Sequence, residues 1–287
     1  MRFSIFTVSL PDYSPEEALK EMKAAGYEGV EWRVTDQKPS ADGKPSFWAG
    51  NRCTWPLASF VEDAPRIRAM TEAAGLAMPS VGTYVSCEDL ASVERAMQGA
   101  VKLGAPMLRV GVPGYDGKAA YLPIVDRAVG AYREVEAMAK RIGIRACIEM
   151  HMNTITSSAS SAAAFVRHFD PKYVGVIHDS GNMVYEGFEQ YRMGLEILGP
   201  YLAHVHFKNA CWQNAGTRPD GSADWKSVAA PFKKGSANLA ALMTALKAVG
   251  YDGWMSFEDF STEEPLVDRI RGNIAFVKEV YKTVSAS

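Results

Sequence analysis

Cysteine, net charge and long apolar runs are all scarce in this sequence. The chain of 287 residues has four cysteines, Cys53, Cys87, Cys147 and Cys211, which lack the close spacing of a metal-binding motif. Because a chain of this length buries a sizeable core without disulfides, we expect all four to be reduced thiols. No apolar run approaches the roughly 20 residues that cross a bilayer, and the N-terminal segment turns polar too early for a signal peptide. These absences predict a cytoplasmic protein without membrane contacts.

An excess of charge of either sign is also missing. Lys and Arg number 31 against 33 Asp and Glu, which gives a formal net charge of −2. Proteins that bind nucleic acids usually carry a basic face, so this balance argues against a nucleic-acid partner. Linkers and low-complexity stretches do not interrupt the chain, so we expect one domain over residues 1–287 that acts on a small molecule.

Short apolar runs alternate along the chain with longer amphipathic stretches, the pattern of repeated βα units around a parallel sheet. The predicted strands are residues 3–9, 29–34, 78–84, 107–112, 146–151, 174–179, 203–208 and 254–258. The predicted helices lie near residues 14–25, 58–74, 88–103, 118–142, 158–168, 188–198, 237–249 and 263–282. Eight such units in fewer than 290 residues favour an α/β fold with a single (β/α)8 TIM barrel, and a doubly wound sheet is the structural alternative.

Local signals support the helix boundaries. Ser14-Pro15-Glu16-Glu17 is a typical helix start. Gly26 and Gly250 each follow the last apolar position of a predicted helix, where a left-handed cap favours glycine. The segments 25–29 and 249–253 resemble each other, and we interpret both as the turn that leads into a barrel strand.

Two connections, residues 35–57 and 209–235, are too long for tight turns. In a barrel both follow strands and lie at the C-terminal face, where active-site lids are found. They carry Trp48, Arg52, Trp55, Trp212, Arg218 and Trp225. Such side chains suit the apolar faces and hydroxyls of a sugar, and packing of the tryptophans on their own barrel is the alternative.

The apolar positions within each strand indicate which side chains point into the barrel, because the outward face is covered by helices. His204, His206 and Lys208 alternate with apolar residues and are predicted to point inward. The same alternation directs Glu149, His151, Asp179 and Glu258 inward at the ends of their strands and His178 outward. Glu31, Arg33 and Arg109 are also predicted to point inward, where they either neutralise one another or bind hydroxyls or a phosphate of a substrate.

Glu149, Asp179, His206 and Glu258 therefore meet at one rim from four consecutive strands. Three carboxylates and an imidazole cannot all stay charged and unpaired there, since an isolated buried charge costs several kcal/mol. A divalent cation bound by these four side chains would balance the negative charge of the carboxylates. Oxygen ligands with one nitrogen and no thiolate suit Mn²⁺, Mg²⁺ or Co²⁺ better than a structural zinc site.

These strand ends resemble a known family. The segments Ile148-Glu149-Met150-His151, His178-Asp179-Ser180-Gly181-Asn182, His204-Val205-His206-Phe207-Lys208-Asn209 and Ser256-Phe257-Glu258 are similar to the metal-binding strand ends of the xylose isomerase-like TIM-barrel superfamily. The resemblance implies that Glu149, Asp179, His206 and Glu258 bind one divalent metal, with Mn²⁺ favoured, and that Glu149 and Glu258 are also the acid/base pair. It implies a carbohydrate substrate and is compatible with a homo-oligomer.

The expected activity is a metal-dependent isomerase or epimerase of a sugar or sugar phosphate that acts through a metal-stabilised enediolate. The alternative is a metal-dependent lyase or dehydratase of a keto-sugar, keto-glycoside or cyclitol with His151 as acid or base. His151 is equally well explained as a hydrogen-bond partner that orients Glu149. The endonuclease branch of the superfamily and a non-catalytic sugar-binding barrel are less favoured, because histidine is scarce and the ligand set is complete.

Two positions depart from the ketose 3-epimerase pattern, since Asn182 and Trp212 stand where those enzymes usually have histidine and arginine. Recognition of substrate hydroxyls is therefore expected to differ. The candidate substrate-binding residues are His151, Asn182, Lys208, Arg109 and Trp212, and Lys208 stands close enough to His206 to polarise a substrate oxygen.

Overall fold

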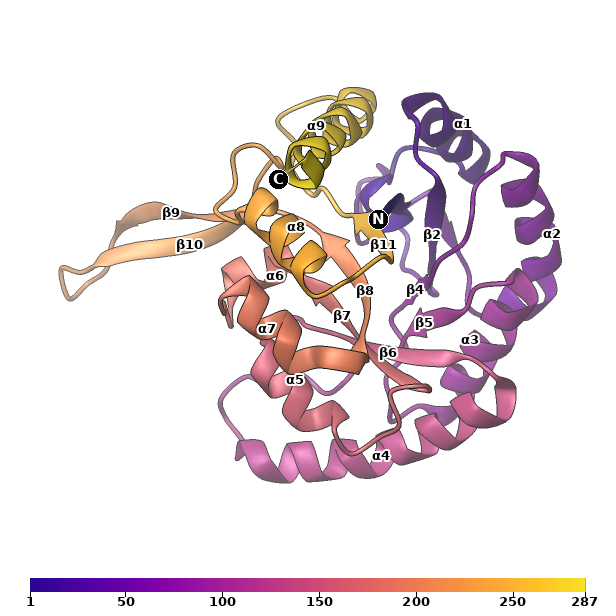
Figure 1. Ribbon diagram of the computed structural model, residues 1–287, viewed down its shortest axis with the longest axis horizontal. Helices are drawn as coiled ribbons and strands as arrows, with labels where there is room; N and C mark the ends of the chain where they lie inside the picture. The colour runs from indigo at the N-terminus through magenta and orange to yellow at the C-terminus, as the bar shows by residue number, and fades with distance from the viewer. Residues whose placement is uncertain (287) are drawn as a thin grey trace.

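Eight parallel strands close on themselves in the computed structural model, which describes residues 1–286 (Figure 1). Around the barrel the strands are β1 (Arg2–Phe6), β2 (Gly29–Val34), β4 (Val81–Thr83), β5 (Met107–Arg109), β6 (Arg145–Glu149), β7 (Val174–Asp179), β8 (Leu202–Phe207) and β11 (Trp254–Phe257). Because β1 pairs in parallel with both β2 and β11, the ring of eight strands is closed. The predicted (β/α)8 barrel is confirmed, and the doubly wound alternative is excluded.

The helices surround the barrel (Figure 1). They are α1 (Pro15–Ala25), α2 (Phe60–Ala73), α3 (Leu90–Leu103), α4 (Tyr121–Ile142), α5 (Ala159–Val166), α7 (Tyr191–Leu198), α8 (Leu239–Ala248) and α9 (Leu266–Ala286). Each corresponds to a helix predicted from the sequence. The short α6 (Ser180–Tyr185), which directly follows β7, and the 3-10 turns η1 (Thr7–Ser9) and η2 (Gly199–Tyr201) were not predicted.

The first helix shows how local sequence sets these boundaries. The Ser14 hydroxyl accepts the Glu17 N–H, and the Glu17 carboxylate accepts the Ser14 N–H, so two otherwise unpaired donors are satisfied at once. Gly26 ends the helix with a φ of 90°. Three residues later Gly29 opens β2, where a Cβ atom would lie 2.6 Å from the Trp254 ring.

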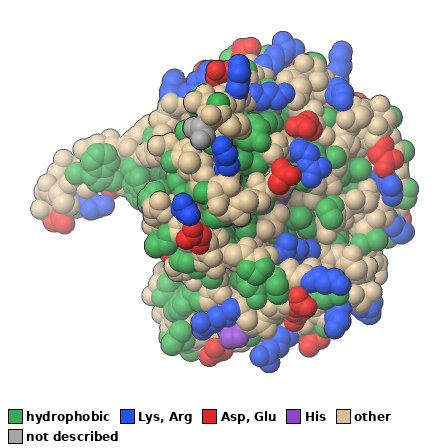
Figure 2. Space-filling view, viewed as in Figure 1, with side chains coloured by type: hydrophobic (Ala, Val, Ile, Leu, Met, Phe, Trp, Pro, Cys, Tyr) green, Lys and Arg blue, Asp and Glu red, His purple; other side chains and the backbone are tan. Residues whose placement is uncertain are grey.

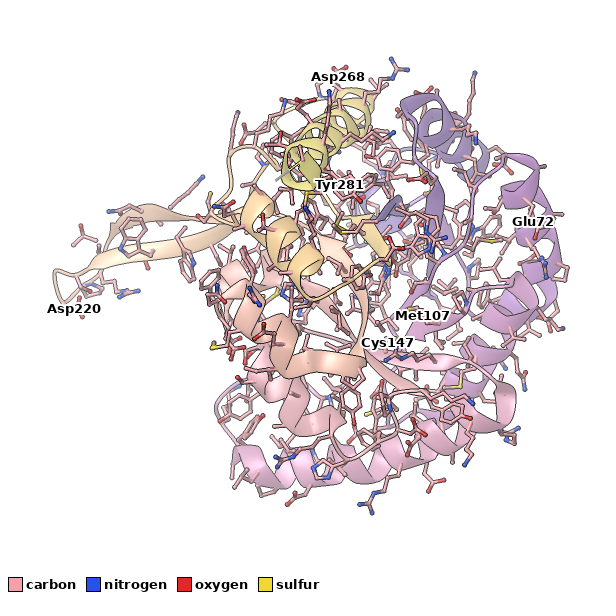
Figure 3. The ribbon with its side chains drawn as sticks, viewed as in Figure 1. Glu72, Met107, Cys147, Asp220, Asp268 and Tyr281 are labelled. Atoms are coloured by element: carbon pink, nitrogen blue, oxygen red, sulfur yellow. The ribbon has the colours of Figure 1, made fainter. Side chains whose placement is uncertain are left out.

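The long connection at residues 209–235 contains regular structure that the sequence pattern did not reveal. It forms an antiparallel hairpin of β9 (Ala210–Thr217) and β10 (Ala223–Ala229). The hairpin projects from the barrel, and Asp220 marks its tip (Figures 1 and 3). In the other long connection, residues 35–57, only β3 (Thr54–Trp55) is a strand, and it pairs with β2.

The barrel interior is packed rather than open. Ser4 and Ser256 share a buried hydrogen bond of 2.9 Å, and the Phe6 ring stacks against His206 with 5.5 Å between ring centres. The four cysteines are free thiols, as predicted. Within residues 1–286 no helix combines the length and apolarity that a membrane span requires.

Candidate metal centre

Four side chains from neighbouring strands converge at the C-terminal rim of the barrel. Glu149 ends β6, Asp179 ends β7, His206 lies in β8, and Glu258 directly follows β11. Their ligand atoms all lie within 4.8 Å of one another, and all four residues are buried. The strand alternation predicted from the sequence therefore brings these four side chains together.

His206 presents its two ring nitrogens to different groups. Nδ1 lies 2.9 Å from Oε1 of Glu149 and 3.5 Å from Oε1 of Glu258. Nε2 lies on the opposite edge of the ring, 3.2 Å from Oε2 of Glu31 in β2. Burial alone would lower the pKa of His206, but the carboxylates of Glu31 and Glu258 raise it well above its usual value. The Nδ1 edge is thus the one directed at the carboxylate cluster, and Glu31 holds the ring from behind.

Asp179 is both a helix cap and a member of the cluster. Its Oδ1 accepts the N–H groups of Gly181 and Asn182 at 2.9 and 2.8 Å, which satisfies the start of α6. Its Oδ2 is buried without a hydrogen bond among the described residues and lies 2.8 Å from Nζ of Lys208. Burial raises the pKa of Asp179, and the neighbouring Glu258 carboxylate raises it further against the effect of Lys208. The Oδ2 atom of Asp179 is therefore paired with the Lys208 ammonium, and a cation bound at the cluster would compete with that ammonium.

Lys208 lies between two of the carboxylates. Its Nζ is 2.8 Å from Oε2 of Glu258 as well as 2.8 Å from Asp179. Gly181 makes this position accessible, because a Cβ atom there would lie 2.5 Å from Cγ of Lys208. Close approach of the lysine stem to the first turn of α6 thus requires glycine.

Arg109 balances the negative charge of the Glu149 carboxylate within the cluster. Its guanidinium binds the Glu149 carboxylate, its Nε donates to the Thr83 carbonyl at 2.7 Å, and it lies 4.3 Å from the centre of the Tyr84 ring. Burial would raise the pKa of Glu149, but Arg109 and His206 hold it well below its usual value. Glu149 is therefore ionised at neutral pH.

The donor set fits a divalent cation. One oxygen from each of three carboxylates and one imidazole nitrogen lie within 4.8 Å of one another, and the Oδ2 atom of Asp179 has the Lys208 ammonium as its ion-pair partner but no further hydrogen-bond partner among the described residues. Hard oxygen ligands with one nitrogen are typical of Mn²⁺, Mg²⁺ and related ions. The second group of adjacent donors, Glu31, His204 and His206, fits less well, because Glu31 already accepts from Nε2 of His204 at 2.9 Å and from His206.

A cavity of about 170 Å³ adjoins the cluster and is lined by Glu149, Arg109 and His151. The Nδ1 atom of His151 lies 2.8 Å from the Met152 carbonyl oxygen. Asn182 is buried beside Glu149, with its amide donating to the Met150 carbonyl at 3.0 Å. Of the predicted substrate-binding residues, His151, Asn182, Lys208 and Arg109 thus surround the cluster.

Trp212 lies away from the cluster, on β9 of the hairpin, where its side chain is half-exposed. Of the other aromatic and basic residues of the long connections, Trp55 is buried, whereas Trp48, Trp225, Arg52 and Arg218 are at least half exposed. Trp55 is buried against Trp32, Arg218 pairs with Asp224 inside the hairpin, and Trp48 packs on Phe260.

Glu31, Arg33 and Arg109 point inward as predicted, but each pairs with a different neighbour. Glu31 binds the two histidines of β8, Arg109 binds Glu149, and Arg33 donates to the Thr54 hydroxyl at 3.1 Å. His178 is buried against Tyr191 of α7, on the outward side of β7.

Tyr84 is a site residue that the sequence analysis did not single out. Its ring lies between the guanidinium groups of Arg33 and Arg109 and lines the cavity. The available signal was its position at the C-terminal end of the predicted strand 78–84, because such positions lie at the active face of a barrel.

Comparison with known proteins agrees with this architecture. The sequence profile of the family described as xylose isomerase-like TIM barrel matches residues 19–280. Comparison with curated protein sequences gives no match.

Several solved structures superimpose over nearly the whole chain. The apo form of 3-keto-D-glucoside 4-epimerase YcjR from E. coli is 16% identical, with a TM-score of 0.72 over 97% of this chain and 99% of that one. D-psicose 3-epimerase from Clostridium cellulolyticum H10 with D-tagatose is 15% identical, with a TM-score of 0.71 over 98% and 99% of the two chains. A xylose isomerase-like TIM barrel protein from Mycobacterium smegmatis in complex with magnesium is 19% identical, with a TM-score of 0.71 over 99% and 97%.

Proposed function

We propose that this chain, which belongs to the xylose isomerase-like TIM barrel family, is a divalent-metal-dependent isomerase or epimerase of a carbohydrate. The observation that carries the proposal is the buried convergence of Glu149, Asp179, His206 and Glu258 at the C-terminal rim of the barrel. Structural similarity to sugar epimerases supports the same class of reaction.

Glu149, Asp179, His206 and Glu258 would hold the cation, with Mn²⁺ favoured and Mg²⁺ or Co²⁺ as alternatives. A divalent ion bound there supplies Lewis acidity toward the carbonyl and the adjoining hydroxyl of a keto-sugar. Lys208 and Arg109 keep the surrounding carboxylates paired, so the site stays buried without an uncompensated negative charge.

Glu149 and Glu258 would transfer protons on opposite sides of a bound sugar. They extend from β6 and β11, which are separated around the barrel by β7 and β8. Ionised Glu149 removes the proton from the carbon next to the carbonyl, and the electron pair of that C–H bond forms the enediolate of the substrate. A proton relayed by Glu258 to the other face of the carbon would invert it, whereas a proton returned to the adjacent carbon gives aldose–ketose isomerisation.

A lyase is the second candidate, and the hydrogen bond of His151 favours it. The Met152 carbonyl can only accept, so Nδ1 of His151 carries the proton and the lone pair of the neutral ring is on Nε2. A basic nitrogen at the cavity beside Glu149 can remove a proton from a keto-sugar, keto-glycoside or cyclitol while a leaving group departs.

Deuterium exchange tests the isomerase proposal. The purified chain with Mn²⁺ in D₂O is incubated with ketoses, aldoses, sugar phosphates and 3-keto-glycosides, and NMR follows deuterium at carbon. Incorporation with the carbon skeleton intact is expected, and Glu149→Gln and Glu258→Gln should each abolish it. Glu264→Gln, an exposed neighbour on the same rim, is the matched control. Full exchange in both active-site variants would contradict the proposal.

The variant His151→Ala separates the two reactions. For a lyase it should abolish release of the leaving group while the bound metal content stays the same. For an isomerase, deuterium incorporation should persist in this variant, because Glu149 and Glu258 carry the proton transfers. Unchanged elimination by His151→Ala would rule out His151 as the acid or base of a lyase reaction, whereas no elimination by the parent chain from any substrate would rule out the lyase itself.

A further inference from the structure

A second hollow lies beside the catalytic cavity on the same rim. It is a groove of about 670 Å³ lined by Tyr115, Asp116, Gly117, Met152, Asn153, Tyr185, Glu186, Trp212 and Ser227. These residues follow β5, β6, β7 and β8, so the groove opens at the same end of the barrel as the metal cluster. Its volume lies within the roughly 300–1,000 Å³ of small-molecule sites, whereas the cavity of about 170 Å³ falls below that range.

The groove and the cavity share one wall. His151 and Thr154 line the cavity, and Met152 and Asn153 between them line the groove. On the other side, α6 packs against β9, and the Tyr185 phenol of α6 lies close enough to Lys208 and Asp179 to feel their charges. A molecule bound at the metal cluster can therefore extend into the groove without crossing the barrel.

Hydrogen bonds between separate loops fix the groove walls. The Asn153 carbonyl accepts the Tyr115 N–H at 2.8 Å, and the Asn153 N–H donates to the Glu186 carboxylate at 2.8 Å. Asn153 adopts a φ of 58°, the left-handed region that asparagine tolerates better than most residues. The loops after β5, β6 and β7 are thus tied together, and a preformed site loses less entropy on binding.

Trp212 supplies a fixed aromatic surface at the groove. Its indole N–H donates to the Val184 carbonyl at 2.7 Å, so its polar atom is satisfied and its ring is held in place. The side chain nevertheless remains 47% exposed. Cross-strand pairing puts Ser227, another groove residue, opposite Trp212, and Trp225 on the same face farther along the hairpin. Hydrophobic side chains are visible along the hairpin in Figure 2.

The chemistry of the lining matches a sugar ring. An indole face packs against the C–H face of a pyranose, while the Asp116 and Glu186 carboxylates and the Ser227 hydroxyl can bind its hydroxyl groups. No lysine or arginine is among the lining residues. Lys118 balances the Asp116 carboxylate at 2.8 Å, and the Glu186 carboxylate accepts the Asn153 N–H, so the groove has no excess of positive charge to favour a phosphate.

We propose that the groove is a second subsite that binds the sugar unit attached to the reacting ring, so that the substrate is a disaccharide-sized glycoside rather than a free monosaccharide. This inference rests on the proposed function, because the reacting ring is placed at the metal cluster. The cavity beside the metal cluster would hold the reacting ring, and the groove would hold the attached sugar ring against the indole of Trp212.

Binding without turnover tests the subsite. The full chain with saturating MnCl₂ is titrated by calorimetry with cellobiose, maltose, gentiobiose and trehalose, and with methyl β-D-glucoside and phenyl β-D-glucoside. At least one disaccharide should bind about tenfold more tightly than methyl β-D-glucoside. Trp212→Ala should remove that difference, whereas Trp212→Phe should keep most of it. Trp225→Ala, which alters the same hairpin face outside the groove lining, should keep all of it.

Each contrary result overturns the proposal in a distinct way. Equal affinity for one-ring and two-ring sugars, or a disaccharide preference that survives in Trp212→Ala with an unchanged melting temperature, contradicts the subsite. A preference for phenyl β-D-glucoside alone would show that an aromatic group occupies the groove instead of a sugar. Failure of the proposed function appears separately, as absent deuterium exchange in every substrate, and leaves these binding results unaffected.

Discussion

Glu31 accepts a hydrogen bond from the edge of His206 that faces away from the carboxylate cluster, at 3.2 Å between Nε2 and Oε2. A carboxylate in this position fixes the tautomer and orientation of a metal-binding imidazole, because the proton on Nε2 leaves the Nδ1 lone pair free for a cation. Since Glu31 also binds His204 at 2.9 Å, one carboxylate of β2 holds both histidines of β8.

Replacing Glu31 should weaken metal binding without removing a ligand. Glu31→Gln keeps the shape of the side chain but loses the charge behind His206, so the affinity for Mn²⁺ should fall about 10- to 100-fold. Calorimetric titration of the apoprotein with Mn²⁺ measures this. Glu264→Gln serves as the surface control, and an unchanged affinity in Glu31→Gln would show that Glu31 does not position the ring.

Lys208 should compete with the metal, because its ammonium lies 2.8 Å from two of the proposed ligand carboxylates. In Lys208→Met the apoprotein leaves buried carboxylates unpaired, so it should lose about 3 kcal/mol or more of stability. Mn²⁺ should then bind about tenfold more tightly than to the parent, since the charge repulsion is gone.

Urea unfolding with and without Mn²⁺ measures both effects of Lys208→Met. The metal should restore much of the lost stability, since binding to the native state alone stabilises it. Lys226→Met on the exposed hairpin is the matched control, and it should change neither quantity. Weaker Mn²⁺ binding in Lys208→Met would contradict the competition.

Gly181→Ala tests whether the close approach of Lys208 to α6 matters. The added Cβ would lie 2.5 Å from Cγ and 2.8 Å from Cβ of Lys208, so we expect a loss of about 1–3 kcal/mol in the free energy of unfolding. Gly130→Ala in α4 has open space around the new Cβ and should instead stabilise by about 0.5–1 kcal/mol. A neutral Gly181→Ala would show that the lysine stem moves aside freely.

Thiol labelling should distinguish Cys211 from the other cysteines. Burial raises the pKa of Cys87 to about 11 and that of Cys147 to about 12, and Cys53 is also buried, so these three should resist a disulfide reagent at pH 8. Cys147 lies in the barrel beside Met107 (Figure 3). One thiol per native chain should react and four after denaturation, and Cys211→Ser should abolish the native reaction.

The alternation of apolar residues was sufficient to predict which polar side chains enter the barrel. That rule depends only on the two-residue period of a strand, and it predicts that Glu149, Asp179, His206 and Glu258 meet at one rim, as they do in the structure. The alternation of apolar residues could not predict which of the inward-pointing side chains form ion pairs with one another. Which carboxylate Arg109 would bind depends on strand stagger and on side-chain packing across the barrel, and neither leaves a local sequence signal.

The hairpin escaped prediction for a different reason. Its strands contain Gln213, Asn214, Gly216 and Asp224, residues of low strand propensity, and most of its side chains are exposed on both faces. A hairpin without a buried face lacks the alternation of apolar and polar residues from which strands are predicted. The sequence analysis named Trp212, at the base of the hairpin, as a candidate substrate-binding residue, but its hydrogen bond to Val184 and its pairing opposite Ser227 depend on the folded hairpin.

Because β1 pairs with β11, the last strand of the chain, the barrel can close only after β11 has been synthesised. Glu258, the final member of the cluster, directly follows β11, so a growing chain acquires its closing strand and its fourth carboxylate almost together. A partly made barrel offers at most three of the four groups, from β6, β7 and β8. Binding of a metal ion by all four side chains therefore requires that the ring of strands is complete.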